Sequence, residues 1–196
     1  MKQADWAEEI ALKLLEIPLP RRWAHSQGVA RQARSLGSIL GKDAGLLEAA
    51  AWLHDIGYSP ELVGTGFHPL DGARYLRDIQ HADDMLCRLV AHHSCAVIEA
   101  EERGLRRILI REFPLPERGL TEALAYCDMT TSPDGHRLTV HDRLAEIETR
   151  YGPGHVVSRS IRRSAPALVT STARVQRRMG KGLIQTARRT AHLAVV

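Results

Sequence analysis

The sequence of 196 residues has few aromatic side chains, few cysteines and no long apolar run. Aromatic residues make up 5% of the chain, whereas Ala, Leu and Arg are abundant, a balance that favours helices over sheets. No apolar run approaches the roughly 20 residues that a membrane-spanning helix needs, and the acidic N-terminus is unlike a secretory signal. The three cysteines lack CxxC spacing, which predicts reduced thiols. We therefore expect a cytoplasmic protein without a membrane partner.

Acidic side chains are missing from the last quarter of the chain. Residues 1–148 carry a net charge of −6, whereas residues 149–196 carry +10 and contain neither Asp nor Glu. A basic segment of this kind raises the question whether the protein binds nucleic acid. However, its arginines alternate with apolar residues, and it lacks aromatic platforms on which bases could stack. We favour docking of the tail on the acidic body, within one chain or between two chains of a homodimer, over nucleic-acid binding.

The length permits one domain with a substantial core. A Tyr-Gly-Pro-Gly break at 151–154 predicts a domain over 1–154 and a basic helical extension over 155–196, whose last residues are expected to fray. No stretch shows sustained alternation with a period of two, so we predict an all-α architecture. The expected helices cover 4–17, 21–40, 44–54, 71–79, 83–93, 95–103, 105–112, 119–131, 139–150 and one or two segments within 156–179. We expect Asp43 to cap the third of them.

The stretch AAAWLHDIGYS at 49–59 combines an apolar helix with two polar residues at its end. Burying an unpaired carboxylate costs several kcal/mol or more, so His54 and Asp55 should have a partner. Neighbours within a regular helix point about 100° apart. At a helix end, Gly57 can let the chain turn without steric cost, so that both side chains converge on one point. The pattern indicates a metal ion as their shared partner.

Further histidines and aspartates lie in or beside apolar helical stretches, where an unsatisfied polar group would be costly. They are His25 in RRWAHSQGVARQA, His68 in FHPLDGARYL, His92 and His93 in LVAHHS, and Asp128 in ALAYCDMT. Imidazole and carboxylate groups together suit Fe, Mn, Co, Ni or Zn better than Ca or Mg, which prefer oxygen ligands alone. One or two divalent transition-metal ions are therefore the expected cofactor.

The order H…HD…D, with HDIG at its centre, resembles the HD superfamily of metal-dependent phosphohydrolases. The resemblance spans roughly residues 21–131 and rests on RxxHSxxVA, AAxLHDIG, HxxxGAxxL, a double histidine and AxxxD, in that order. It implies that residues 1–154 form an HD-domain bundle of about seven to nine helices. Many HD phosphodiesterases and tetraphosphatases carry a Lys shortly after HD, where this chain has Tyr58. That departure argues against assignment to one of those subfamilies.

The resemblance implies a role for each matching residue. His25, His54, Asp55 and Asp128 would bind a first metal ion. His68 and either His92 or His93 match the extra histidines of two-metal subfamilies, in which the HD aspartate, here Asp55, bridges both ions. His54 and Asp55 would be the catalytic residues. Arg74 and Thr131 are candidate substrate-binding residues, for which solvation and a helix C-terminal turn are the respective alternatives.

The implied function is a phosphohydrolase acting through a metal-bound hydroxide. The substrate would be a small phosphorylated molecule, a nucleotide or a similar metabolite, cleaved at a phosphate ester or anhydride by a phosphomonoesterase, phosphodiesterase or nucleotide pyrophosphohydrolase activity. Two alternatives stay open. A di-iron oxygenase of the HD fold would use the same ligands with O₂, and a non-catalytic HD module would sense a nucleotide.

Overall fold

The structure is a computed structural model that describes residues 2–193, with side chains described through Lys181. In this range every regular segment is helical, which confirms the all-α prediction; the one β-type contact is an isolated bridge between Thr131 and Arg137. The helices are α1 (Gln3–Leu15), α2 (Pro20–Ser35), α3 (Gly37–Leu40), α4 (Ala44–Leu53), α5 (His68–Asp78), α6 (Asp84–His92), α7 (Ala96–Glu102), α8 (Arg106–Glu112), α9 (Arg118–Met129), α10 (Val140–Tyr151) and α11 (Val156–Leu193). Short 3₁₀ turns cover Gly41–Asp43, Ile56–Tyr58 and His93–Cys95. Over residues 2–193, each helix is too short or too polar to pass through a bilayer.

Three expected boundaries were wrong in informative ways. The helix expected over 21–40 breaks at Leu36 into α2 and α3, and α5 begins at His68, three residues before the expected start. Asp43 does precede α4, but its side chain makes no capping hydrogen bond, because a 3₁₀ turn leads directly into the helix. The basic segment forms one helix that continues through Leu193. Fraying was expected over 180–196, but residues 180–193 are helical, and residues 194–196 lie outside the described residues.

Helix α4 is the centre of the molecule. Its sequence is almost entirely apolar, and α1, α2 and α9 all pack around it. Leu47 and Leu53 are fully buried, and burial of each such side chain contributes about 1.5–3 kcal/mol relative to exposure. Because the helix is apolar on several faces, it is stable only where other helices cover those faces, which places it in the core. Whatever polar side chains follow its last residue are therefore placed in the interior.

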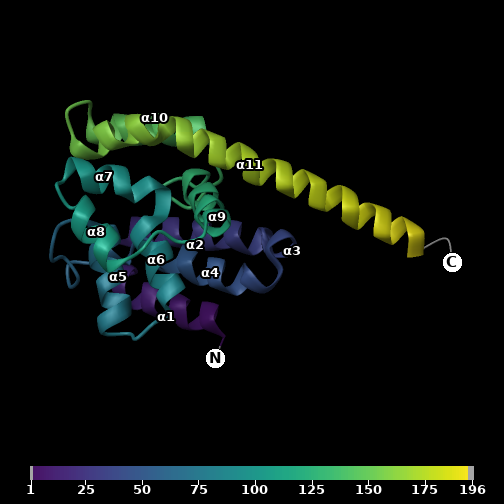
Figure 1. Ribbon diagram of the computed structural model, residues 1–196, viewed down its shortest axis with the longest axis horizontal. Coiled ribbons are helices and arrows are strands. Elements are labelled where there is room, and N and C mark those ends of the chain that lie inside the picture. Colours follow the sequence, from purple (N-terminus) through teal and green to yellow (C-terminus); the bar gives the residue numbers. More distant parts are fainter. Residues whose placement is uncertain (1, 194–196) are drawn as a thin grey trace.

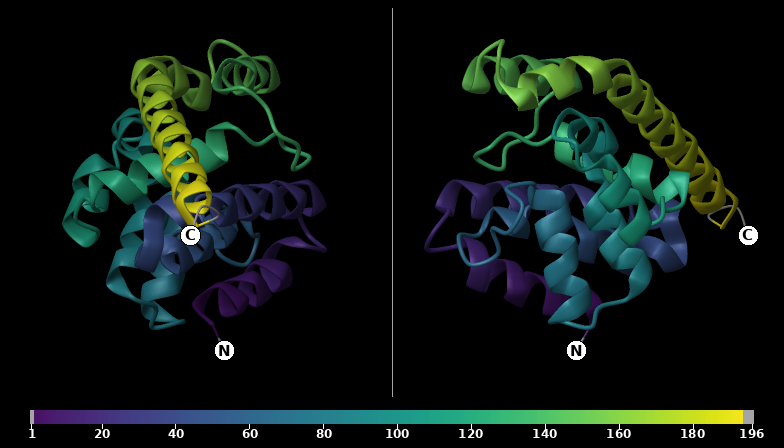
Figure 2. Two further views of the ribbon diagram at one scale, coloured as in Figure 1. Left: turned by 90° about the vertical axis from the view of Figure 1, so that its right-hand side faces the viewer. Right: turned by 60° about the vertical axis from the view of Figure 1, so that its left-hand side comes forward.

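Helices α10 and α11 form a layer on the side of the body opposite α1 (Figures 1 and 2). The first part of α11 packs on α7, α9 and α10, and its Leu168 and Val175 side chains are almost fully buried. Arg163 pairs with Glu102 at 2.6 Å, and Arg174 pairs with Glu122 at 2.6 Å. Exposed ion pairs of this type contribute about 0–1 kcal/mol each. The first part of the basic segment thus docks on the acidic body of its own chain, mainly through apolar contacts.

Position 57 requires glycine because the backbone of α5 lies against it, not because its backbone angles are unusual. It lies in the 3₁₀ turn Ile56–Tyr58, and its φ is not positive. A Cβ at this position would lie 2.0 Å from the carbonyl oxygen of His68 and 2.7 Å from the nitrogen of Gly72. Both are backbone atoms of α5, so the turn and the helix touch. The chain turns at Gly57 as expected, but glycine is needed there for close packing and not for conformational freedom.

Replacement of Gly57 by Ala should therefore destabilise the fold. We expect Gly57→Ala to lower the free energy of unfolding by about 2–4 kcal/mol, because two backbone segments must separate. Gly45→Ala is the matched control: Gly45 is exposed on α4, and a methyl group added there would have no atom within 4 Å, so this change should stabilise by about 0.5–1 kcal/mol. Urea denaturation measures both. Equal effects of the two substitutions would contradict the packing account.

Candidate metal centre

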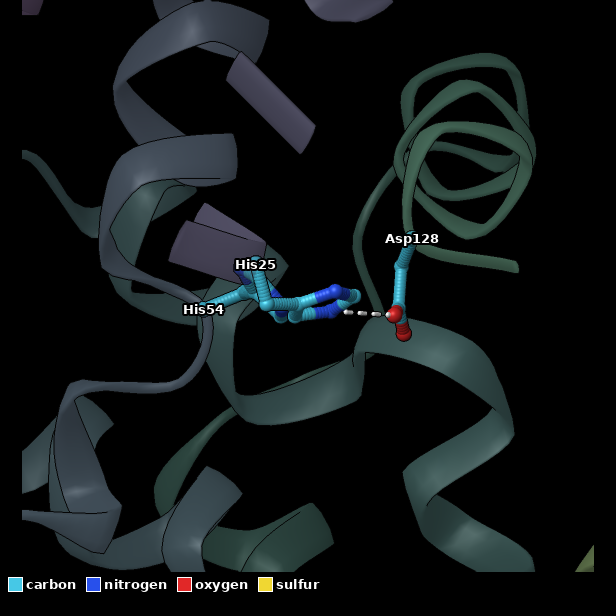
Figure 3. Close-up of side chains that lie close together, drawn as sticks. All are labelled: His25, His54 and Asp128. Atoms are coloured by element: carbon cyan, nitrogen blue, oxygen red, sulfur yellow. Dashed lines mark hydrogen bonds and ion pairs between the residues drawn. The ribbon is translucent and has the colours of Figure 1, made fainter. Parts of the chain in front are cut away.

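Three helices bring the first set of candidate ligands together. His25 lies in the middle of α2, His54 follows the last residue of α4, and Asp128 lies near the end of α9. Figure 3 shows both imidazole rings directed at the Asp128 carboxylate. His25 Nε2 is 3.0 Å from Asp128 Oδ1, and the ring centroids of His25 and His54 are 5.3 Å apart. One ligand atom of each residue lies within 4.8 Å of the others, which is close enough to share one ion.

A second set adjoins the first. Asp55, His68 and His93 also place one ligand atom each within 4.8 Å of the others. His68 Nε2 is 3.1 Å from His93 Nε2 and 3.4 Å from Asp55 Oδ1. The second carboxylate oxygen of Asp55, Oδ2, is 3.6 Å from Nε2 of His54. Asp55 therefore has one oxygen beside each set.

Backbone carbonyls fix the tautomer of three histidines. The Nδ1 atom of His25 is 2.9 Å from the Ser132 carbonyl oxygen, and that of His93 is 2.7 Å from the Val90 oxygen. His54 Nδ1 bonds the Ala51 oxygen at 2.8 Å. Because a carbonyl oxygen only accepts, each Nδ1 carries the proton and donates it. Each ring consequently directs Nε2 into the cluster and, when it binds a metal ion, does so through the lone pair of that nitrogen, which is the usual arrangement of a metal-binding histidine.

One of these lone pairs has no protein partner in the part of the chain that the structure describes, and the other two face atoms that are themselves candidate metal ligands. His54 Nε2 is buried and has no hydrogen-bond partner among the described residues. His93 Nε2 faces a second imidazole nitrogen, and His25 Nε2 faces a carboxylate oxygen. Where such a lone pair faces another lone pair or a carboxylate oxygen, a cation between them removes the repulsion: a proton in the metal-free protein, or a bound metal ion. The residues therefore fit a divalent ion in each set.

The surroundings keep the groups in their ligand forms. Burial lowers the pKa of His68 well below its usual range and outweighs the opposing charge of Asp55, and burial likewise lowers the pKa of His93. Burial alone would raise the pKa of Asp55, but the charge of Arg22 and the nearby histidines together hold it well below its ordinary value. The pKa of Asp128 is depressed in the same way, with His25 opposing the effect of burial. Neutral imidazole and ionised carboxylate are the forms that bind metals.

The structure does not bring every candidate residue to the clusters. His92 points away: its Nε2 donates to the Phe113 carbonyl oxygen at 2.6 Å. Arg74 makes a two-pronged ion pair with Glu112, at 2.6 and 3.0 Å. Thr131 is fully buried, and its hydroxyl donates to the Cys127 carbonyl oxygen at the end of α9. None of these three lines the pocket beside the clusters, so we leave them out of the proposed site.

Sequence reasoning assigned no role to three residues that approach the carboxylates, although one of them, Arg22, is the first residue of the motif RxxHSxxVA. Arg22 donates to Asp55 Oδ2 at 2.7 Å, and its guanidinium lies 3.7 Å above the Tyr58 ring centroid. The Ser94 hydroxyl donates to Asp128 Oδ2. Arg143, which is buried, has NH2 3.9 Å from Asp128 Oδ1. Arg22 lies one helical turn before His25, a spacing that could have revealed it, whereas nothing near Arg143 in the sequence signals its position.

A pocket opens over the two clusters. The body supplies Asp55, His68, His93 and Asp128 as its floor, and Tyr58 stacks on His68 with ring centroids 3.9 Å apart. Residues of α10 and α11 form the opposite wall: Arg143, Ile147, Arg150, Tyr151, Val157, Ser160, Ile161 and Ser164. The basic segment after residue 154 thus contributes directly to the wall of the pocket.

Comparison with known proteins agrees with this geometry. The family model of the HD domain matches residues 22–128. A protein named Ribonuclease Y from Rubrobacter xylanophilus is 33% identical over 70 residues, which are 36% of this chain and 14% of that protein. The chain therefore matches only a small part of that relative's length. No solved structure gave a significant match.

The adjacent His92 and His93 give a matched test of the site. We expect His93→Gln to lose one of two bound divalent ions per chain, because Nε2 of His93 faces the second cluster. His92→Gln should keep both ions, since the Gln amide can still donate to the Phe113 oxygen. Metal content after dialysis, measured by plasma mass spectrometry, checks both variants. Equal metal loss in the two would contradict the placement.

Proposed function

Because the chain belongs to the HD domain family of metal-dependent phosphohydrolases, we propose that it hydrolyses a phosphate ester or anhydride of a nucleotide or a similar small metabolite. The single observation that carries this proposal is the pair of adjoining His/Asp sets beneath one pocket. In each set, two imidazole nitrogens and one carboxylate oxygen lie within 4.8 Å of one another, and in the first set His54 Nε2 has no hydrogen-bond partner among the described residues. Structural metal sites are closed, whereas this one borders a pocket with room for a substrate.

Each cluster residue has a defined task in this proposal. His25, His54 and Asp128 would hold one ion, His68 and His93 the other, and Asp55 would contact both. Bound divalent ions supply charge neutralisation for phosphoryl oxygens and lower the pKa of water from 15.7 to about 7. Hydrogen bonds of the three histidines to backbone carbonyls orient the rings, so that the ligand atoms need little rearrangement.

Other residues of the chain position the carboxylates and the substrate. Arg22 holds Asp55 through Oδ2, and Ser94 holds Asp128 through its own Oδ2. Ser94 and Cys95 have φ angles of 47° and 63°, left-handed values that are uncommon outside glycine. This backbone turn directly follows His93 and brings the Ser94 hydroxyl to Asp128. Ile147, Tyr151 and Ile161 of α10 and α11 supply an apolar surface on the opposite side of the pocket.

The phosphodiester of an RNA is the second candidate substrate. It is favoured by the local similarity to Ribonuclease Y and by the net charge of +10 on residues 149–196. A long polymer would have to enter between the body and the α10–α11 layer. A small substrate meets no such requirement, and for this reason it is the primary proposal.

Hydrolysis by the Mn²⁺-loaded protein under anaerobic conditions tests the function. We expect release of phosphate from at least one nucleoside mono- or diphosphate, or of a nucleoside monophosphate from a cyclic nucleotide, and a fall of at least 10³-fold in kcat/KM for Asp55→Asn, which weakens both ion sites. Asp84→Asn, an exposed change on α6, is the control and should keep full activity. The anaerobic assay also separates hydrolysis from an oxygenase reaction.

The outcomes are distinct. Turnover of a short ribo-oligonucleotide but of no free nucleotide would transfer the proposal to the second candidate. Absence of any phosphoester turnover by protein that contains two ions per chain would overturn it.

A further inference from the structure

We propose that three arginines, Arg22, Arg143 and Arg150, form a subsite for a second phosphate of the substrate. This arginine wall lines the pocket above the clusters, and the same three residues also line a smaller adjoining pocket together with Arg21, His25 and Pro133. The inference rests on the proposed function and narrows it to substrates with two linked phosphates. Two of its three residues, Arg143 and Arg150, lie beyond the family match, which covers residues 22–128.

The wall lies next to the candidate metal ligands. Arg22 NH1 is 2.7 Å from Asp55 Oδ2, and Arg143 NH2 is 3.9 Å from Asp128 Oδ1. The arginines therefore approach the two carboxylates from the pocket side of the clusters. A phosphoryl group held over the clusters would have a neighbouring phosphate within reach of guanidinium groups. Guanidinium is the side-chain group best suited to bind phosphate through two parallel hydrogen bonds.

The positive charge of the wall is poorly compensated within the protein. Glu146 is the shared partner of two arginines: it bonds Arg143 through Oε2 and lies 3.4 Å from Nε of Arg150 through Oε1. Arg22 pairs with Asp55, which is itself a candidate ligand. Two guanidiniums thus share Glu146, and the other carboxylates beside the wall, Asp55 next to Arg22 and Asp128 at 3.9 Å from Arg143, are candidate metal ligands.

Burial makes this imbalance significant. The Arg143 side chain is only 4% exposed, yet its Nε has no hydrogen-bond partner among the described residues. A buried charged group normally has all of its donors paired. Excess guanidinium charge beside two sites for divalent ions is balanced best by a ligand with several negative charges. Two linked phosphates supply these charges, whereas one phosphate monoester supplies at most two.

The shape of the pocket favours a small molecule as the carrier of these phosphates. Ile147 and Tyr151 of α10 and Ile161 of α11 close the wall opposite the clusters. This apolar surface adjoins the arginines and suits the uncharged part of a compact ligand. We therefore assign the site to a phosphoanhydride such as a nucleoside diphosphate.

Binding of inorganic pyrophosphate and inorganic phosphate to the metal-free protein tests the wall without catalysis. In isothermal titration calorimetry we expect pyrophosphate to bind at least ten-fold more tightly than phosphate. Arg150→Met should weaken pyrophosphate about ten-fold, and Arg150→Lys should weaken it less. Arg150 is partly exposed, so its replacement should leave the fold intact. Arg107→Met, an exposed change on α8, is the matched control and should have no effect.

Kinetics of the Mn²⁺-loaded protein separate failure of this inference from failure of the proposed function. The ratio of kcat/KM for ADP to that for AMP should fall about ten-fold in Arg150→Met and stay unchanged in Arg107→Met. Turnover of both nucleotides with an unchanged ratio, or equal affinity for pyrophosphate in the wild type and Arg150→Met, would overturn the subsite and leave the hydrolase standing. Turnover of neither nucleotide nor any other phosphoester would overturn the function and the subsite together.

Discussion

The structure depends on one constraint: histidine Nε2 atoms and carboxylate oxygens converge at one place in the buried interior. Backbone carbonyls of Ala51 and Val90 accept hydrogen bonds from the Nδ1–H groups of His54 and His93, and so turn the Nε2 nitrogens inward. Ionised Asp55 and Asp128 lie at the same place. No hydrogen-bond donor of the described residues satisfies His54 Nε2. Divalent cations resolve this conflict, and the same cations would give the pocket its chemistry.

The fold creates that constraint through the position of helix ends. The apolar sequence of α4 forces it into the core, so the residues that follow it, His54 and Asp55, are buried as well. The close contact of Gly57 with α5 brings His68 back to Asp55. The left-handed turn at Ser94 ends the α6 segment and directs a hydroxyl to Asp128. The α10–α11 layer then covers the assembled groups with arginine and apolar side chains.

The sequence predicted the helical architecture and the order of the chemistry-bearing residues, because both depend on short-range patterns. It could not decide between His92 and His93, since that choice depends on the residue at which α6 ends. Arg74 and Thr131 showed the limit of inference from proximity along the chain. Arg74 is paired with Glu112, and the Thr131 hydroxyl donates to a backbone carbonyl of α9. Arg143 approaches the site only because α10 folds back over α9, a tertiary contact without a local signal.

The central claim is that the two His/Asp sets each hold a divalent ion. Anomalous X-ray diffraction from crystals grown with Mn²⁺, recorded above the manganese absorption edge, tests it most directly. The account predicts two strong peaks, one among His25, His54 and Asp128 and one among His68, His93 and Asp55, with Asp55 next to both. Well-ordered crystals without anomalous density at these residues, or with density only at the protein surface, would contradict it.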